Sequence, residues 1–508
     1  MLEKYMQNNL NSQKTILNEA FISFSGMTAG SVLRYLFSII MARFLGAQML
    51  GIYSLSNAIL RIAEIFALSG LDNGVLRFVS RDVNDKHNVE NAIFSSLKSG
   101  LIFSLIISTI LFLSAEWIVF NLFNDEKFLV TVIKVFCFSL PFTVMTLIAS
   151  HATQAFKILK YKIFVNQLVN PFVLLVGFIF SFIIFGSEVS ILIPTLLSAT
   201  IGFLFIMRFL RNFIKYNFKK IISSKIDNDI IKFSLPLMFV SAIGILMHWI
   251  DILMIGYISD STSVGMYHPI DRTAGLVRMV LFAFAGIFAP IFSEKYFNND
   301  TLGMDNALKS STKSILFFSM PVFIFLFIFS QPMLLLFGSE FNNGIALKVL
   351  LVGIFCQTIF GLGSSTLTMS GNTSYNLLNV SLALVINVIF NFQLIPALGI
   401  LGAAISTTLS LIILSFLRFI ENLTILKLNI LSMKMVKPIF SGCISFSIFN
   451  YFYFNFYTSE GQSIFIQALL LFVILIFVII TFLVISIVIG LDEDEKIFFE
   501  NLKHKIIS

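Results

Sequence analysis

Charged residues are scarce in this chain of 508 residues, where Asp, Glu, Lys and Arg together make up 12%. A soluble domain carries roughly 25%. The three cysteines lie in separate apolar segments, which excludes a disulfide framework and a cysteine-ligated metal site. No glycine-rich loop of the pattern G-x-x-x-x-G-K-[ST] occurs, so the sequence predicts no ATP-driven transport. It also predicts no cofactor and no metal.

Apolar residues are abundant instead, at 57% of the chain, and a soluble core could not hide this much apolar surface. A helix needs about 20 apolar residues to span a bilayer. The sequence predicts an all-α polytopic membrane protein with about 14 transmembrane helices. We expect them at Phe21–Leu45, Leu50–Leu76, Ile93–Phe123, Leu129–His151, Phe164–Phe185, Val189–Met207, Phe233–Ile258, Val264–Phe292, Ile315–Phe337, Ile345–Ser370, Tyr375–Ile395, Ile400–Leu417, Ile439–Tyr457 and Ile464–Gly490.

The distribution of cations between the loops supports an even number of spans. Nearly all loop lysines and arginines fall on the side that holds both termini. The opposite side has only Arg43, Lys127, Lys134 and Lys348. Because cytoplasmic loops are enriched in Lys and Arg, we expect both termini in the cytoplasm and a multi-pass protein of a bacterial or archaeal cell membrane.

The chain also repeats at an offset of 214 residues, which aligns Gly51 with Gly265 and Tyr53 with Tyr267. A repeat of six spans keeps its orientation, so the halves are parallel repeats about an axis along the membrane normal. The predicted segments are an N-terminal cytoplasmic segment (1–20), a first six-helix bundle (21–213), a basic linker (214–232), a second six-helix bundle (233–418), two further helices (437–490) and a cytoplasmic tail (491–508).

Four arginines, Arg34, Arg61, Arg272 and Arg278, lie inside predicted spans. At about 1.5 Å per residue, three of them are roughly 16–21 Å deep, which is near mid-membrane. Such charges usually face a protein interior or a wet cavity. We expect these guanidinium groups to bind a phosphate-bearing substrate between the bundles. The alternative is an ion-pair staple, because Glu64 lies at i+3 from Arg61.

A second polar group lies nearer the outer face. His248 and Asp251 are one helical turn apart, as are His268 and Asp271. Protonatable groups at such depth can couple a proton or sodium ion to transport. Glu64, His248, Asp251 and Asp271 are therefore ion-coupling candidates. The alternative is a polar contact between neighbouring helices, without a transport role.

Several segments resemble one known family. These are residues 51–55, 69–79, 337–341, 371–372, 387–391, 394–396 and 399–404. They resemble the Wzx-type polysaccharide flippases, part of a superfamily with the multidrug exporters and the lipid II flippase, over roughly residues 20–420. The resemblance implies two six-helix bundles around a central cavity, and a substrate of oligosaccharide on undecaprenyl diphosphate that is turned to the outer leaflet. It implies that cavity arginines engage the diphosphate, here Arg34, Arg61 and Arg278.

The resulting hypothesis is a flippase for surface polysaccharide biosynthesis, a transporter and not an enzyme. Expected partners are the lipid-linked oligosaccharide, membrane lipid, a polysaccharide polymerase and glycosyltransferases, with no nucleic acid. Two alternatives share the fold, a multidrug exporter and a lipid II flippase. A third, from another class, is a membrane-embedded glycan polymerase or ligase, which would need catalytic residues that the short outer loops do not offer.

Overall fold

The structure is a computed structural model that describes residues 2–81, 85–123, 126–156, 158–457 and 463–490, with side chains described from Ile22 onward. Over these residues it contains helices and turns and no strand, which confirms the predicted fold class. The predicted cytoplasmic tail, 491–508, lies outside the described residues. By their internal contacts the residues form two compact units, Met1–His268 and Pro269–Ser508.

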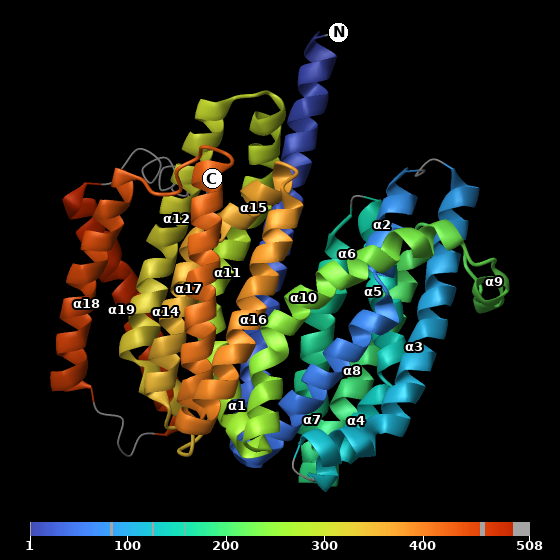
Figure 1. The fold of residues 1–508 in the computed structure, drawn as a ribbon, viewed down its shortest axis with the longest axis horizontal. Coiled ribbons are helices and arrows are strands. Elements are labelled where there is room, and N and C mark those ends of the chain that lie inside the picture. The colour runs from blue at the N-terminus through green and yellow to red at the C-terminus, as the bar shows by residue number, and fades with distance from the viewer. Residues whose placement is uncertain (1, 82–84, 124–125, 157, 458–462, 491–508) are drawn as a thin grey trace. The chain divides into compact units, whose positions relative to one another are not determined.

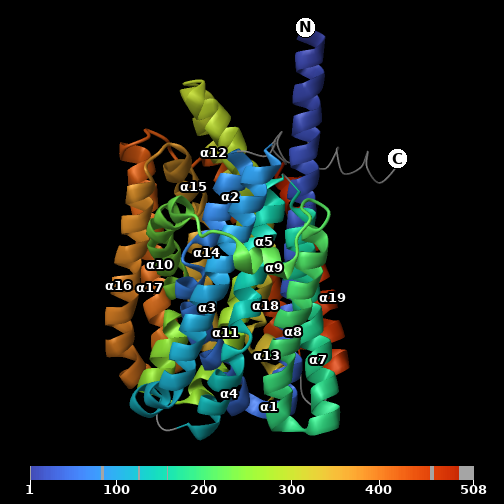
Figure 2. The same ribbon diagram turned by 90° about the vertical axis from the view of Figure 1, so that its right-hand side faces the viewer.

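The first unit contains the helices from α1 to the start of α11 (Figure 1). Its helices are α1 (Leu2–Leu68), α2 (Leu71–Arg81), α3 (Lys86–Leu122), α4 (Lys127–Cys137), α5 (Leu140–Ala155), α6 (Lys160–Ile163), the π-helix η1 (Phe164–Val169), α7 (Asn170–Phe185), α8 (Ser187–Leu210), α9 (Phe218–Ser223) and α10 (Asn228–Ile258). Helices α7 and α8 form a closely packed antiparallel pair, which Figure 2 shows side by side.

The second unit contains most of α11 (Ser261–Phe297) and the rest of the chain. Its other helices are α12 (Thr301–Ile328), α13 (Ser330–Leu335), α14 (Gly344–Phe360), α15 (Leu362–Met369), α16 (Thr373–Leu398), α17 (Ile400–Thr424), the short 3₁₀ helix η2 (Met433–Met435), α18 (Val436–Phe456) and α19 (Ile464–Ile489). Helix α17 packs against both α14 and α16, and α18 and α19 both pack against α12.

Eleven described helices are long and apolar enough to cross a membrane, or up to twelve if the bent pair α4–α5 is one span. Helix α1 counts once among them, yet it is two helices joined at Gly46, whose backbone has φ 78° and ψ 180°. Residues with a Cβ avoid this conformation. Helix α18, with 21 residues, lies outside that set. Counting both arms of α1, the bent pair and α18, the described helices agree with about 14 spans.

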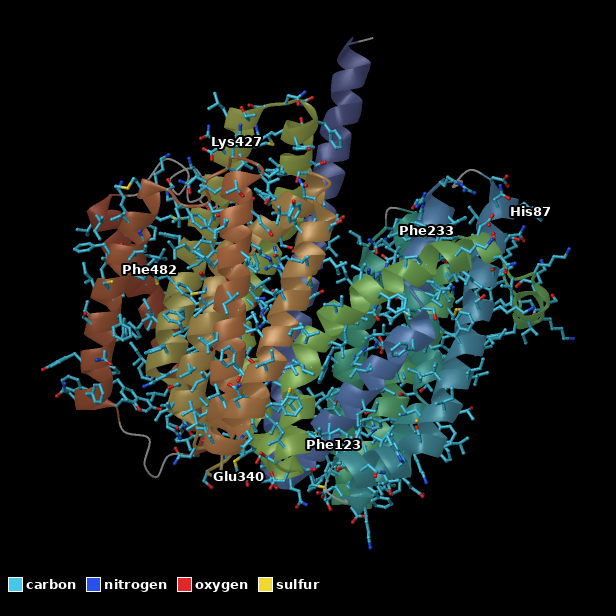
Figure 3. All side chains as sticks on the ribbon, in the orientation of Figure 1. His87, Phe123, Phe233, Glu340, Lys427 and Phe482 are labelled. Carbon is cyan, nitrogen blue, oxygen red and sulfur yellow. The ribbon has the colours of Figure 1, made fainter. Side chains whose placement is uncertain are left out.

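The structure corrects two predicted spans. The span Leu50–Leu76 is broken after Leu68, where Ser69 and Gly70 both have positive φ, and α2 begins at Leu71. The span predicted to end at Leu417 continues to Thr424. Within each unit, loops that the sequence assigns to opposite sides of the membrane lie at opposite ends of the helices. Figure 3 shows His87 and Phe123 at the two ends of α3, and Glu340 and Lys427 at the two ends of the second unit.

Reciprocal backbone contacts within the first unit join residues that the predicted repeat makes equivalent. A Cβ added to Gly51 would lie 1.6 Å from the Ser261 carbonyl oxygen, and one added to Gly265 would lie 1.7 Å from the Ala47 carbonyl oxygen. Each Cβ would also lie 2.9 Å from the backbone nitrogen of the other glycine. The offset of 214 maps Ala47 onto Ser261 and Gly51 onto Gly265. Equivalent residues of the two repeats therefore meet around a local two-fold axis.

Candidate functional site: arginines at membrane depth

Arg61 forms a two-pronged ion pair with Glu64, one helical turn further along α1. Its Nη1 donates to Glu64 Oε2 at 2.8 Å and to Oε1 at 3.1 Å. The Arg61 side chain is 47% exposed, whereas that of Glu64 is 11% exposed. The staple predicted from the i, i+3 spacing is therefore present. With this ion pair formed, about half of the Arg61 side-chain surface is still exposed.

Arg34 lies on the other arm of α1 and is half-buried. Its Nη2 donates to the Gln167 side-chain oxygen at 2.6 Å, in the π-helix η1. That helix comes close to α1 because Gly30 has no side chain, since an added Cβ would lie 2.3 Å from the Gln167 carbonyl oxygen. The Gln167 amide oxygen therefore orients the Arg34 guanidinium group.

Both arginines lie at a similar depth because α1 folds back at Gly46. Arg34 precedes Gly46 by 12 residues and Arg61 follows it by 15, which places them about 18 and 22 Å from the turn at 1.5 Å per residue. A hydrocarbon core is about 30 Å thick. Two guanidinium groups on neighbouring arms of one helical hairpin thus lie well inside the membrane.

Arg272 and Arg278 lie on α11 in the second unit, and both are half-buried. The structure gives the positions of both arginines along α11. Their distances from Arg34 and Arg61 are not determined, because the placement of the two units relative to one another is not determined. The four-arginine diphosphate site thus stays a prediction. Arg61 and Arg34 are the pair whose placement along one element can be compared directly.

The ion-coupling candidates have different surroundings. Asp251 is buried on α10 and accepts a hydrogen bond from the Tyr267 hydroxyl at 3.2 Å. His248 is exposed and packs edge-on against Trp249. Asp271 is half-buried on α11. His268 is buried and contacts two serines of α1 through its two ring nitrogens. Whether any of them couples an ion to transport stays a prediction.

Sequence reasoning missed a buried arginine, because Arg418 follows the predicted span by one residue and was assigned to a loop. In the structure α17 continues past it, and the side chain is buried. Its Nη2 donates to Asn376 Oδ1 at 3.3 Å, an atom that also accepts from Ser364 Oγ at 3.0 Å. One turn along, Glu421 accepts from the Asn379 amide. The polar residues of α15–α17 are the feature of the sequence that could have indicated a buried partner for Arg418.

A second missed group lies at the end of the first unit where α2, α5 and α6 meet. The Lys162 ammonium lies 3.0 Å from His151 Nε2 and donates to Gln154 Oε1 at 2.8 Å. His151 Nδ1 lies 2.9 Å from the Leu147 carbonyl oxygen, and its Nε2 lies 3.9 Å from the Asp72 carboxylate. This network ties α2, α5 and α6 together. Among the described residues no three His, Cys, Asp or Glu side chains are grouped as a metal site.

Comparison with curated proteins finds distant relatives in archaea. Over 387 residues the chain is 24% identical to the probable low-salt glycan biosynthesis flippase Agl15 of Haloferax volcanii, covering 75% of this chain and 78% of that protein. Over 410 residues it is 22% identical to an uncharacterized membrane protein of Methanocaldococcus jannaschii, again covering 75% of this chain and 78% of that protein.

Solved structures share the fold. The lipid II flippase MurJ in an inward closed conformation superposes with a TM-score of 0.72 at 15% identity, over 94% of this chain and 99% of that one. A multidrug resistance MATE family transporter in an inward-facing conformation gives 0.65 at 19% identity, over 79% of this chain and 96% of that one.

A family model described as polysaccharide biosynthesis protein matches residues 40–346, which is more than half of the chain. The match begins in the first arm of α1 and ends in α14. It therefore includes the crossing of the two repeats, Arg61 with its partner Glu64, and both arginines of α11. This chain belongs to the family of polysaccharide biosynthesis proteins and has the fold shared by the lipid II flippase and the multidrug exporters.

Proposed function

We propose that this protein is a flippase that turns a lipid-linked oligosaccharide from the cytoplasmic to the outer leaflet by alternating access. The carrier is undecaprenyl diphosphate, and the product serves surface polysaccharide biosynthesis. The observation that carries the proposal is the half-exposed Arg61, about 22 Å from the turn of α1. A cation at that depth is costly to leave facing lipid, so we expect it to face the interior of the protein, in a wet cavity that an anionic headgroup can enter.

The chemistry of the two arms of α1 fits a diphosphate. A guanidinium group stays charged in a poorly solvated site and presents forked donors to phosphate oxygens. Glu64 occupies one edge of Arg61 and Gln167 one edge of Arg34. We expect a diphosphate to compete with these partners while the apolar lipid tail stays in the bilayer. Arg272 and Arg278 on α11 are further candidates for binding the diphosphate.

The fold comparison supports a glycolipid substrate over a drug. The match to the lipid II flippase covers 94% of the chain, whereas matches to multidrug transporters cover 79–80%. An exporter of cationic drugs would also be expected to place acids at mid-depth, where this chain has arginines. The relative named as a glycan biosynthesis flippase points the same way. Lipid II itself is the second candidate substrate, on the strength of the structural match.

The proposal places the protein in the cell membrane with both termini in the cytoplasm, as the loop cations indicate. In this orientation the turn at Gly46 and the loop at Glu340 are on the outer side, and the turns at His87 and Lys427 are cytoplasmic. Glycosyltransferases would supply the lipid-linked oligosaccharide on the inside. A polysaccharide polymerase would use it on the outside.

The test is reconstitution into vesicles with a fluorescent oligosaccharide on undecaprenyl diphosphate, scored by access of an external glycan-modifying reagent. Arg61→Ala and Arg278→Ala are run beside Lys219→Ala, an exposed lysine of α9. We expect wild type and Lys219→Ala to flip and both arginine variants to lose at least tenfold in rate. Equal flipping by all four would show a flippase whose arginines are structural. No flipping by correctly inserted wild type would reject the function.

Lipid II in the same vesicles separates the two candidate substrates, because it shares the carrier and the diphosphate and differs in its sugar. Preference for lipid II at equal concentration would favour the second candidate. Preference for the oligosaccharide would favour the first. In either case a fluorescent cationic dye should not move, and its export would favour the multidrug alternative.

A further inference from the structure

The buried ring of His268 bridges α11 to both arms of α1. His268 is 3% exposed, although its helix is only beginning there. Its Nδ1 lies 2.8 Å from Ser54 Oγ and its Nε2 lies 3.2 Å from Ser38 Oγ. Both ring nitrogens therefore contact hydroxyl oxygens, one on each arm. All three residues belong to the first unit.

The two serine hydroxyls already bond to backbone carbonyls of their own helix. Ser54 Oγ donates to the Leu50 carbonyl at 2.8 Å, and Ser38 Oγ donates to the Arg34 carbonyl at 3.0 Å. A hydroxyl has one hydrogen to donate and can still accept. While both hydrogens stay on the carbonyls, both ring nitrogens must act as donors. A histidine donates from both nitrogens only when it carries the extra proton.

The neutral ring can also be accommodated at this position. One serine would turn its hydrogen from the carbonyl to the unprotonated ring nitrogen, while that carbonyl keeps its helical backbone bond. A neutral hydrogen bond exchanged in this way is worth about 1 kcal/mol. The site can therefore gain or lose a proton without leaving a buried polar atom unsatisfied. The change alters how firmly the ring holds the two arms of α1.

The bridge lies just inside the crossing of the two repeats. Ser38 and Ser54 are each eight residues from Gly46, so they lie at equal depth, about 12 Å from the turn. Gly51 and Gly265, whose backbones touch, are each three residues before Ser54 and His268. The offset of 214 also maps Ser54 onto His268. The ring thus joins equivalent positions of the two repeats at the outer ends of their helices.

Other charged and titratable groups on the surrounding elements can influence this ring. They include Arg34, Tyr35 and Arg43 on the first arm of α1, Tyr53, Arg61 and Glu64 on the second arm, His248, Asp251 and Tyr257 on α10, and Tyr267, Asp271 and Arg272 on α11. The first of these to consider is Asp251, because it binds the hydroxyl of Tyr267, the residue before His268. A buried carboxylate beside this segment favours a positive charge nearby.

We propose that His268 is a proton-binding site that latches the outer ends of α1 and α11. With the proton bound, the ring donates to Ser38 and Ser54 together and holds the glycine crossing closed. Loss of the proton weakens the bridge and permits the outer ends to separate. The use of this latch in alternating access rests on the proposed flippase function, whereas the latch itself can be measured without substrate.

The experiment measures the distance between spin labels at the outer ends of the two helices as the pH is changed. Labels are placed at Gln48 on α1 and Thr262 on α11 after replacement of Cys137, Cys356 and Cys443. Between about pH 5 and pH 8 we expect the separated population to rise with pH, by at most tenfold per pH unit for one proton. His268→Gln should abolish the dependence. His87→Gln, at an exposed histidine on α3, should leave it unchanged.

Ser54→Ala serves as the second variant in case His268→Gln does not fold. It keeps the ring and removes one acceptor of the protonated form, so it should move the transition to lower pH. A distance independent of pH in wild type, or the same transition in His268→Gln, overturns the latch. A wild type that latches but moves no lipid-linked oligosaccharide in vesicles counts against the flippase function and leaves the latch standing.

Discussion

Arg61 and Arg418 both lie in transmembrane helices, but their surroundings differ in kind. Arg61, halfway along an arm of α1, is 47% exposed and has the carboxylate of Glu64 as its partner. Arg418, near the C-terminal end of α17, is 8% exposed and bonds to an amide oxygen of Asn376. The first arginine sits where a ligand could reach it. The second is enclosed by α15, α16 and α17.

The contrast teaches that the partner and the exposure of a membrane arginine, taken together, separate a binding role from a structural one. A half-exposed arginine contributes little to stability through its ion pair, because its surroundings still compete for its charge. A buried charge whose hydrogen bonds are removed leaves its neighbours unsatisfied, which is costly. The contrast therefore fits the proposed substrate role of Arg61 and a packing role for Arg418 in the second unit.

The sharpest test of this division is Arg418→Met, which keeps the volume of the side chain and removes its charge and donors. The change leaves the Asn376 oxygen with one donor fewer and takes a positive charge from beside Glu421. We expect a loss of about 2–4 kcal/mol in the free energy of unfolding. The measurement is the thermal melting temperature in detergent, which should fall by several degrees.

Arg61→Met is the matched control for that variant. The Arg61 side chain is 47% exposed, but the Glu64 carboxylate left behind is buried, so we expect a loss of about 1–2 kcal/mol, smaller than for Arg418→Met. Equal melting temperatures for the two variants would contradict the division. A larger loss for Arg61→Met would reverse it, because the staple with Glu64 would then hold the first unit together.

A smaller effect is expected from Glu64→Gln, which weakens the competitor for Arg61 while keeping a hydrogen-bonding side chain. If the substrate diphosphate displaces Glu64, removing its charge should tighten substrate binding. An exposed pair is worth up to about 1 kcal/mol, which corresponds to roughly a fivefold change in affinity. The measurement is the substrate concentration that gives half-maximal flipping in vesicles.

Glu116→Gln provides the comparison for Glu64→Gln. Glu116 pairs with Lys134 at 2.6 Å on an exposed surface of α3 and α4, and we place it outside the substrate path. This variant should leave the half-maximal concentration unchanged. A Glu64→Gln variant with weaker binding would mean that the carboxylate orients Arg61 for the substrate and does not compete with it.

The helices and the repeat could be predicted from sequence because the bilayer restricts what a spanning segment can be. Long apolar runs must form helices there, since no water is present to satisfy the backbone. The offset of 214 was visible in pairs such as Gly51 and Gly265, and the structure places these two glycines in contact. The i, i+3 spacing likewise predicted the Arg61–Glu64 pair.

The features that could not be predicted depend on contacts between segments far apart in the sequence. Hydropathy did not predict the break at Ser69–Gly70, because the apolar run before it resumes with Leu71, Val75 and Leu76. Arg418 looked like a loop cation because its burial depends on α15 and α16, and Asn376 lies 42 residues away. The bridge from His268 to Ser38 spans 230 residues. A periodic pattern within one helix does not report partners at such separations.

The smallest expected effect is on the stability of the second unit, from a change outside the membrane at the turn before α12. It tests how much an exposed polar contact of this unit contributes to its stability. Asp300 is the N-cap of α12, where its carboxylate accepts from the Gly303 N–H at 2.8 Å and lies 3.4 Å from the Lys295 ammonium. The Gly303 hydrogen bond, and then Lys295, hold the pKa of this exposed carboxyl below its ordinary value of 3.8.

A carboxyl with a lowered pKa stabilises the folded state above the ordinary value, and this contribution is lost as the pH falls through the lowered one. Asp300→Ala should therefore melt slightly below wild type near pH 6, and the difference should shrink below about pH 4. Thermal melting at a series of pH values measures it. A pH-independent difference would assign the stabilisation to the shape of the turn. A difference as large as that of Arg418→Met would mean that solvent exposure does not separate structural from dispensable charges in this unit.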